Sequence, residues 1–404
     1  MQTAEYIELE DRFSARNYDP LNIILEYGDG AWVYDIGGKR YLDCLSSYSA
    51  LNHGHRHPRI VEAMKQQLDR LSLTSRAFRN DQFGPFCQEL CELTGYDMTL
   101  VMNSGAEAVE TALKAARKWA YTRRMPTLPV DANLAEIIAF EGNFHGRTIT
   151  IISFSTELQY RQGFGPFTPG FKNVAYGDLR EFEASISPTT VAVLIEPIQG
   201  ESGIRLPPDG FLRQVREVCT NNNLLLIADE IQTGLGRTGK LFGCDHENVR
   251  ADIMIVGKAL AGGMYPVSAV LSSREILGVF EPGDHGSTFG GNPLGMAVAR
   301  AALKVLVEEG LIENSDRMGR YFMSRLAELP KKHIKQIRGR GLLIGVEIKS
   351  QSGPARPFCE ALAREGILCK ETHGQVIRFA PPLIINSEAI DWAMHRIEQV
   401  LTNM

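Results

Sequence analysis

Two apolar segments of the chain are each followed by a side chain that can do chemistry. Residues 224–228 run directly into Asp229, and residues 253–256 are followed, after one glycine, by Lys258. Continuous apolar runs of this length are typical of central strands in a parallel sheet buried on both faces. Ligands of such sheets bind outside the carboxyl ends of the strands. We therefore expect the carboxylate and the amine to meet at one edge of a sheet.

An amine and a carboxylate placed together in this way suit pyridoxal 5′-phosphate. The amine can form a Schiff base with the cofactor aldehyde, and the carboxylate can keep the pyridine nitrogen protonated. Each residue alone has an ordinary explanation, because an Asp after a strand is commonly a cap or a metal ligand and a Lys there is commonly solvated. Further motifs decide between these interpretations.

The phosphate end of such a site is visible at Asn103-Ser104-Gly105-Ala106-Glu107-Ala108, which follows a short strand and opens a helix. Small residues there let backbone N–H groups approach an anion at the positive end of the helix. The same segment also reads as a capping box, with Ser104 as the cap and Glu107 three residues later. The two interpretations are compatible.

Length and charge limit the kind of protein this is. A chain of 404 residues exceeds one hydrophobic core and implies two or three domains. The net charge of −5 argues against nucleic acid or an anionic membrane surface as the main partner, and no apolar run reaches membrane-spanning length. The acidic first residues resemble neither a secretory signal nor a transit peptide. Seven scattered cysteines are typical of reduced thiols, so we expect a cytoplasmic protein.

Strand-like and helix-like segments alternate along most of the chain, which predicts a mixed or parallel sheet covered by helices. A long helix is expected over residues 293–309, and residues 125–133 read as a surface insertion. Beyond residue 309 the strands become shorter, which indicates a smaller α+β unit that ends in a helix over 387–401. Strands are expected at residues 100–102, 137–140, 191–195, 224–228, 253–256, 267–271, 342–348, 367–369 and 376–379, and helices also at 107–123 and 209–222.

Six motifs in fixed order make the chain resemble the class III pyridoxal-phosphate-dependent aminotransferases of fold type I. They are NSGAEA (103–108), GNFHGRT (142–148), EPIQGE (196–201), ADEIQTGLGRTG (228–239), GKALAGG (257–263) and HGSTFGGNP (285–293). The resemblance implies an α/β fold with a mainly parallel seven-stranded sheet in a large domain and a smaller C-terminal domain. The expected division is an N-terminal segment (1–45) that packs with the small domain, the large domain (46–290) and the small domain (291–404). It also implies a homodimer with active sites at the interface.

The resemblance assigns roles in cofactor binding. Lys258 would hold the cofactor and shuttle a proton, and Asp229 would pair with the pyridinium nitrogen. The other contacts would be made to the ring hydroxyl by Gln232, to the ring face by Phe144, to the phosphate by Gly105 and Ala106, and to the phosphate of the neighbouring subunit by Ser287 and Thr288.

Four further segments look most like the ornithine δ-aminotransferase branch: NYDPL (17–21), SSYSALNHGH (46–55), YPVSAV (265–270) and THGQVIRFAPPL (372–383). This branch moves the δ-amino group of ornithine to 2-oxoglutarate, giving glutamate and glutamate-5-semialdehyde, which cyclises to pyrroline-5-carboxylate for arginine breakdown or proline synthesis. Arg147 and Tyr18 would hold the α-carboxylate and α-amine of ornithine. Arg378 would bind the α-carboxylate of glutamate and be neutralised by Glu201 during the ornithine step, while Tyr48 would line the channel.

Other interpretations stay open. The arginines could form surface ion pairs and the tyrosines could be packing residues. His145 stands where the ornithine branch often has tryptophan, which leaves acetylornithine, 4-aminobutyrate or lysine as alternative amine donors. A glutamate-semialdehyde-type aminomutase or a silent binding protein are alternatives of other classes. The His53/His55/His57 group has no carboxylate or cysteine to complete a metal site, so no metal is expected.

Overall fold

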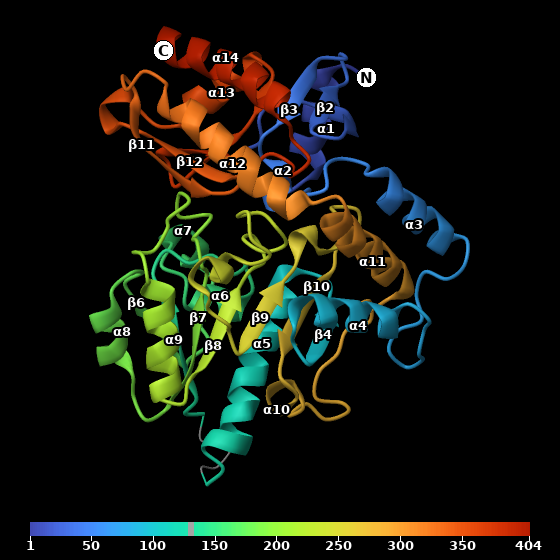
Figure 1. Ribbon diagram of the computed structural model, residues 1–404, viewed down its shortest axis with the longest axis vertical. Coiled ribbons are helices and arrows are strands. Elements are labelled where there is room, and N and C mark those ends of the chain that lie inside the picture. Colours follow the sequence, from blue (N-terminus) through green and yellow to red (C-terminus); the bar gives the residue numbers. More distant parts are fainter. Residues whose placement is uncertain (128–132) are drawn as a thin grey trace.

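The computed structural model describes residues 1–127 and 133–404 (Figure 1). A sheet surrounded by helices forms the lower part of the view, and the C-terminal elements lie above it together with the N-terminal strands. The surface insertion expected over residues 125–133 lies mostly outside the described residues. Within the described part of the chain, every helix falls short of the length and apolar character needed to cross a bilayer.

The central sheet has seven strands and is mainly parallel, as predicted. Only β10 runs against its neighbours, and the other strands share one direction. The strand that the sequence did not predict, β6, lies at the edge and is only partly buried, so its pattern carries little apolar signal. In spatial order the strands are β4 (Met98–Met102), β10 (Ser268–Ser272), β9 (Ile253–Val256), β8 (Leu225–Asp229), β7 (Thr190–Ile195), β5 (Glu136–Phe140) and β6 (Phe171–Val174).

Helices cover both faces of this sheet, which explains why its central strands are apolar throughout. Successive side chains of a strand point to opposite faces. Leu225 and Ile227 of β8 therefore join the core beneath α5 (Gly105–Trp119), whereas Leu226 joins the core beneath α9 (Phe211–Asn221). All residues of β7, β8, β9 and β10 are buried. The expected helices at 107–123 and 209–222 are confirmed, the first with a π-helical end at Ala120–Arg124.

The C-terminal part contains a separate antiparallel sheet covered by three helices. Two of its strands, β11 and β14, were missed because their residues are polar and largely exposed or half-buried. The sheet order is β11 (Ile334–Arg340), β12 (Leu343–Ile348), β15 (Val376–Phe379) and β14 (Lys370–Thr372), and the helices are α12 (Leu311–Ala327), α13 (Arg356–Arg364) and α14 (Ser387–Asn403).

A third sheet joins the two ends of the chain. β13 (Ile367–Leu368) pairs in parallel with β3 (Arg40–Asp43), which is followed in the sheet by β2 (Trp32–Asp35) and β1 (Leu25–Asp29). In Figure 1 the blue N-terminal strands accordingly lie beside the red C-terminal helices. The domain boundaries at 45/46 and 290/291 stay predictions.

The remaining elements connect these sheets. The expected long helix is confirmed as α11 (Pro293–Glu308), which begins with Asn292 as its cap and proline at its first position. The others are α1 (Thr3–Phe13), α2 (Ser46–Ser49), α3 (Pro58–Leu68), α4 (Phe83–Thr94), α6 (Ile149–Ser153), α7 (Leu158–Arg161), α8 (Leu179–Ser185), α10 (Arg274–Leu277), and the 3₁₀ turns Gly243–Glu247, Lys258–Ala261 and Ser350–Ser352.

Candidate active site

The carboxyl ends of β8 and β9 deliver Asp229 and Lys258 to one cavity, as the sequence predicts. Asp229 is the last residue of β8, and Lys258, two residues beyond the end of β9, begins a 3₁₀ turn. The cavity has a volume of about 210 Å³. Its lining also includes six of the residues expected to bind cofactor or substrate or to flank them, namely Gly105, Ala106, Phe144, His145, Glu201 and Gln232.

Lys258 is poised to exchange a proton. Burial lowers the pKa of its amine to about 8, and the negative charge of Glu201 opposes this shift. An amine with this pKa loses its proton far more readily near neutrality than an ordinary lysine does. Lys258 therefore has the properties of a nucleophile that can also act as a general base.

Asp229 is held by two protein contacts on the floor of the cavity. One carboxylate oxygen accepts the Ile231 N–H at 3.0 Å, and the other lies 2.6 Å from Nδ1 of His145. Burial alone would lower the pKa of His145, but the bond and charge of Asp229 outweigh it, so the pKa of this imidazole is raised. These two contacts fix the Asp229 carboxylate in the lining of the cavity.

Glu196 is a buried carboxyl beside this pair that the sequence reasoning missed. It directly follows β7, and Ile195 is paired with Ala228 in the sheet, so Glu196 and Asp229 leave adjacent strands at the same level. Burial raises the pKa of Glu196 to about 8. Its Oε2 accepts the backbone N–H of Phe144 at 3.0 Å. The signal that pointed to Asp229, a polar residue at the end of an apolar strand, would also have found Glu196.

The first turn of α5 forms the other end of the cavity. Ser104 caps the helix, and its side chain and that of Glu107 satisfy each other's backbone N–H groups, so the capping box is confirmed, while phosphate binding stays a prediction. Gly105 and Ala106 follow the cap at the positive end of a 15-residue helix. A Cβ at Gly105 would come within 3.0 Å of Ile231, which leaves little room for any larger residue.

Glu201 and Arg378 form a close ion pair at the cavity. Arg378 Nη1 lies 2.5 Å from Glu201 Oε1, and the Arg378 side chain is only 1% exposed, against 26% for Glu201. Burial would raise the pKa of Glu201, but the guanidinium of Arg378 holds it below the usual range. Gln232 donates its side-chain N–H to the same Glu201 oxygen at 3.2 Å. The structure thus brings together Glu201, Arg378 and Gln232, which the family resemblance assigned to substrate and cofactor binding.

Tyr48 lies against this pair because of an unusual turn. The Arg378 guanidinium lies over its ring at 4.9 Å from the centroid. All four residues of Ser46–Ser49 have positive φ, a left-handed conformation that costs about 1–2 kcal/mol per non-glycine residue. Asp43 opposes this cost by accepting the backbone N–H groups of Leu45 and Ser46 at 3.0 and 2.8 Å. No sequence pattern in this segment predicted the turn.

Arg147 is stacked rather than paired. Its guanidinium lies 3.6 Å from the ring centroid of Tyr160 and 5.5 Å from that of Phe144. Within the described ranges, no carboxylate lies in ion-pair contact with it. Sequence reasoning named Arg147 and Phe144 but missed Tyr160, because a lone tyrosine 13 positions beyond an arginine gives no pattern.

Six predicted residues lie outside the cavity lining: Tyr48, Arg147 and Arg378, whose contacts are given above, and Tyr18, Ser287 and Thr288. Tyr18 is 75% exposed on the N-terminal segment. Ser287 accepts a hydrogen bond from Asn103 at 2.9 Å, next to the α5 cap, and Thr288 is exposed. Their assigned roles stay predictions.

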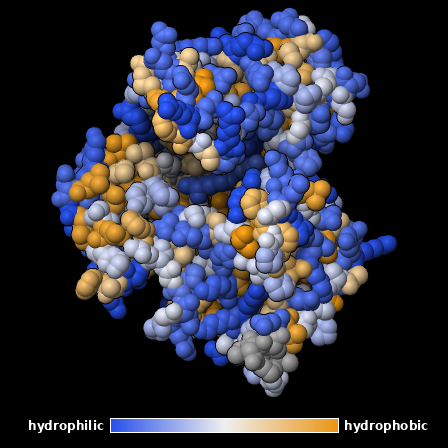
Figure 2. All heavy atoms as spheres, turned by 180° about the vertical axis from the view of Figure 1, so that it is seen from behind, coloured by the Kyte–Doolittle hydropathy of each residue, from blue (hydrophilic) through white to orange (hydrophobic). Residues whose placement is uncertain are grey.

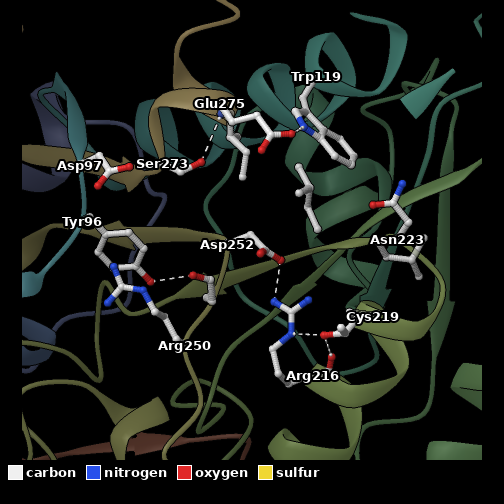
Figure 3. Close-up of a pocket in the computed structure, with 15 residues that line it drawn as sticks. Tyr96, Asp97, Trp119, Arg216, Cys219, Asn223, Arg250, Asp252, Ser273 and Glu275 are labelled. Carbon is white, nitrogen blue, oxygen red and sulfur yellow. Dashed lines mark hydrogen bonds and ion pairs between the residues drawn. The ribbon is translucent and has the colours of Figure 1, made fainter. Parts of the chain in front are cut away.

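A larger cavity, of about 530 Å³, lies at the amino ends of β8 and β9, the opposite edge of the sheet (Figure 3). Its polar groups are largely bonded to one another. Arg216 pairs with Asp252 at 2.6 Å, the Tyr96 hydroxyl donates to the Ala251 carbonyl at 2.8 Å, and Arg250 is stacked on the Tyr96 ring at 4.1 Å. Burial raises the pKa of its Cys219 thiol to about 12, and its lining lacks a lysine beside a strand-end carboxylate such as the smaller cavity has, so the smaller one is the candidate active site.

The histidines that could suggest a metal are bound in other ways. His55 lies 2.8 Å from Asp43, His57 lies 3.1 Å from Glu309, and His53 contacts the carbonyl of Ala302 at 2.9 Å. Among the described residues, no group of three or more metal-binding side chains converges.

Comparison with known proteins identifies the family of the chain. The family described as aminotransferase class-III matches residues 13–401. An ornithine aminotransferase from Brevibacillus brevis is 58% identical, covering 99% of this chain and 98% of the relative. A solved ornithine aminotransferase from Toxoplasma gondii, described as having partial occupancy of PLP at its active site, has a TM-score of 0.96 at 44% identity, covering 100% of this chain and 94% of that one.

A second solved structure comes from a neighbouring branch. The acetylornithine aminotransferase from Elizabethkingia anophelis has a TM-score of 0.89 at 44% identity, and each chain is covered in full. The family match spans nearly the whole chain and includes every residue that lines the cavity. The chain belongs to the class-III aminotransferase family.

Proposed function

We propose that this protein is an ornithine δ-aminotransferase, which transfers the δ-amino group of L-ornithine to 2-oxoglutarate to give glutamate and glutamate-5-semialdehyde. The observation that carries the proposal is the Glu201–Arg378 pair at the Lys258 cavity. An enzyme that accepts a terminal amine in one step and an α-amino acid in the other needs an α-carboxylate site that can be closed and opened. The close relatives named ornithine aminotransferase support the same substrate.

Pyridoxal 5′-phosphate is the cofactor that the cavity fits. Lys258 and Asp229 lie on its floor, the α5 N-terminus offers backbone N–H groups for a phosphate, and Phe144 and Ile231 supply apolar walls. When bound, the cofactor supplies an electron sink for the carbon that loses a proton. Gln232, which lines the cavity, would bind the ring hydroxyl.

The chain's own residues then divide the work. Lys258, whose amine has a pKa of about 8, would take the proton from the substrate carbon that bears the amine and deliver it to the cofactor carbon that receives the amino group. Asp229, hydrogen-bonded to His145, would hold the ring nitrogen of the bound cofactor in its protonated form. Neither function needs a metal.

The two arginines orient the substrates. Arg147, with Tyr18, binds the α-amino acid end of ornithine, so that the δ-amine points to Lys258. Glu201 neutralises Arg378 during that step. In the second half-reaction Glu201 releases Arg378, which binds the α-carboxylate of glutamate or 2-oxoglutarate, and the distal carboxylate of that substrate binds Arg147. Tyr48 limits the width of the channel beside Arg378.

A homodimer in the cytoplasm completes the proposal. Figure 2 shows hydrophobic side chains gathered on the flank of the molecule that carries α3 and α4. Exposed residues of that region include Leu68, Leu71, Phe78 and Phe289, the last next to Thr288. A second copy covering this flank would place Ser287 and Thr288 against the phosphate of the neighbouring subunit.

The test is the purified, cofactor-loaded protein offered ornithine, acetylornithine, 4-aminobutyrate and lysine in turn, with and without 2-oxoglutarate. We expect ornithine to be preferred and turnover to require 2-oxoglutarate, whereas an aminomutase would need no acceptor. Lys258→Ala should abolish turnover. Preference for acetylornithine would move the protein to that branch, and wild-type turnover by the variant would remove Lys258 from the mechanism.

A further inference from the structure

The stack beneath Arg147 is a feature that the roles above do not explain. The Arg147 guanidinium lies 3.6 Å from the Tyr160 ring centroid, a shorter distance than that of Arg378 over Tyr48, which is 4.9 Å. Tyr160 belongs to the short helix α7 and is half-buried, whereas Arg147 is exposed in the single chain. A flat ring in van der Waals contact with a flat cation limits the tilt of the guanidinium.

Among the described residues this contact leaves Arg147 without a carboxylate partner, although the Tyr160 hydroxyl also interacts with the guanidinium. A guanidinium directs its five N–H donors outward in its plane, and stacking occupies only its face. A carboxylate partner would have occupied this edge and cancelled the charge, as Glu201 does at Arg378 through one contact. A ring partner orients the charge and keeps it available for a substrate carboxylate.

Tyr160 is itself held in place. Its ring meets Phe144 edge to face, with centroids 6.1 Å apart and an angle of 81°. Phe144 is anchored through its backbone N–H to Glu196 at 3.0 Å. The helix that carries Tyr160 is tied back by Arg161, which donates to the carbonyl of Ser155 at 3.3 Å. The position of Arg147 is thus linked through Tyr160 to the wall of the cofactor cavity.

We propose that Tyr160 is a positioning residue that sets substrate specificity by holding the Arg147 fork toward the cavity for the carboxylate farthest from the reacting amine. The proposal rests on the proposed function, because it assigns that carboxylate to the α-amino acid end of ornithine and to the distal end of 2-oxoglutarate. A substrate that lacks this group gains nothing from the stack.

The experiment compares Tyr160→Leu with Tyr160→Phe in the cofactor-loaded enzyme. Leucine fills similar space without a ring, and phenylalanine keeps the ring without the hydroxyl. Loss of a partly desolvated cation–π contact is expected to raise KM for ornithine and for 2-oxoglutarate about fivefold to tenfold, with little change in kcat. We expect Tyr160→Phe to stay within about twofold of wild type. Two matched substrates lack the distal carboxylate, 1,4-diaminobutane as donor and 2-oxobutanoate as acceptor, and their kinetics should not change in Tyr160→Leu.

Three results would overturn the proposal. An unchanged KM in Tyr160→Leu would show that Arg147 needs no stack. An equal loss for substrates with and without the distal carboxylate would indicate a general structural effect, and a loss in Tyr160→Phe equal to that in Tyr160→Leu would assign the role to the hydroxyl. If the wild-type enzyme does not use ornithine, the proposed function fails, while the comparison of 2-oxoglutarate with 2-oxobutanoate still decides the role of Tyr160.

Discussion

The two arginines at the active site, Arg147 and Arg378, are held in opposite ways. Arg378 lies on the buried strand β15, is 1% exposed and is paired with Glu201 at 2.5 Å. Arg147 lies on an exposed turn, has an aromatic ring against its face and is without a carboxylate partner among the residues that the structure describes. The charge of Arg378 is therefore neutralised by a partner, whereas the charge of Arg147 stays exposed.

The difference explains how one cavity can treat the two ends of ornithine differently. A free α-carboxylate site next to Lys258 would let ornithine bind with its α-amine at the reacting position. In the proposed function the ion pair removes that possibility as long as Glu201 stays in place, and the exposed charge of Arg147 would attract the amino acid end instead. A dicarboxylate substrate can compete with Glu201 for Arg378, whereas ornithine offers a methylene stem there.

The largest expected effect is a loss of activity in only one of the two half-reactions when Arg378 is replaced. The double variant Glu201→Gln/Arg378→Leu removes both members of the pair and leaves no unpaired buried charge. Its kcat/KM for 2-oxoglutarate should fall about a hundredfold, since a charge-assisted carboxylate contact is lost, while transfer from ornithine should stay within about threefold. Arg147→Leu should instead weaken both substrates. Separate measurement of each half-reaction by rapid mixing decides this, and equal losses in both for the double variant would contradict the division of roles.

A second contrast concerns stability. Glu201→Ala leaves the Arg378 charge buried without its partner, so we expect the free energy of unfolding to fall by about 2–3 kcal/mol. Arg147→Leu removes an exposed charge and should change it by less than about 0.5 kcal/mol. Urea unfolding of the cofactor-loaded proteins measures both values. Equal stabilities for the two variants would show that the pair is not an isolated buried interaction.

The smallest expected effect is a pH dependence of stability, which the Glu201–Arg378 pair should show and Arg147 should not. The pKa of Glu201 is lowered in the folded protein, so its contribution to stability is present above the ordinary value of 4.5 and is lost as the pH falls through the folded pKa. The stability difference between wild type and Glu201→Gln should therefore be constant from pH 6 to about pH 5 and shrink below it. Arg147→Gln, as the control, should show a difference that does not vary with pH. A stability difference between wild type and Glu201→Gln that grows as the pH falls would contradict the lowered pKa of Glu201.

Many of the site residues could be predicted from the sequence because they lie in recognisable motifs, several of them at the ends of strands. Asp229 and Lys258 follow buried apolar strands, so their meeting at one edge follows from the parallel sheet. The Glu201–Arg378 pair was predicted from the family resemblance and is present in the structure.

The features that were not predicted depend on contacts between distant segments. The proposed role of Tyr160 depends on its contact with Arg147 of the GNFHGRT turn, and the position of Glu196 depends on the register of β7 and β8. The left-handed turn at Ser46–Ser49 runs against the intrinsic preference of its residues and is stabilised by Asp43. The polar edge strands β11 and β14 carry no hydrophobic alternation from which to infer them.

The most direct test of the masked arginine is the ratio of two single-turnover rates, glutamate against ornithine as amine donor, in wild type and Glu201→Ala. Each rate is followed by the change in cofactor absorbance after mixing with one donor. Freeing Arg378 should favour an α-carboxylate beside Lys258, and a change of about 2–5 kcal/mol at such a charge corresponds to a shift in the ratio of about thirtyfold or more toward glutamate. A ratio that stays within about threefold of wild type would show that Glu201 does not mask Arg378.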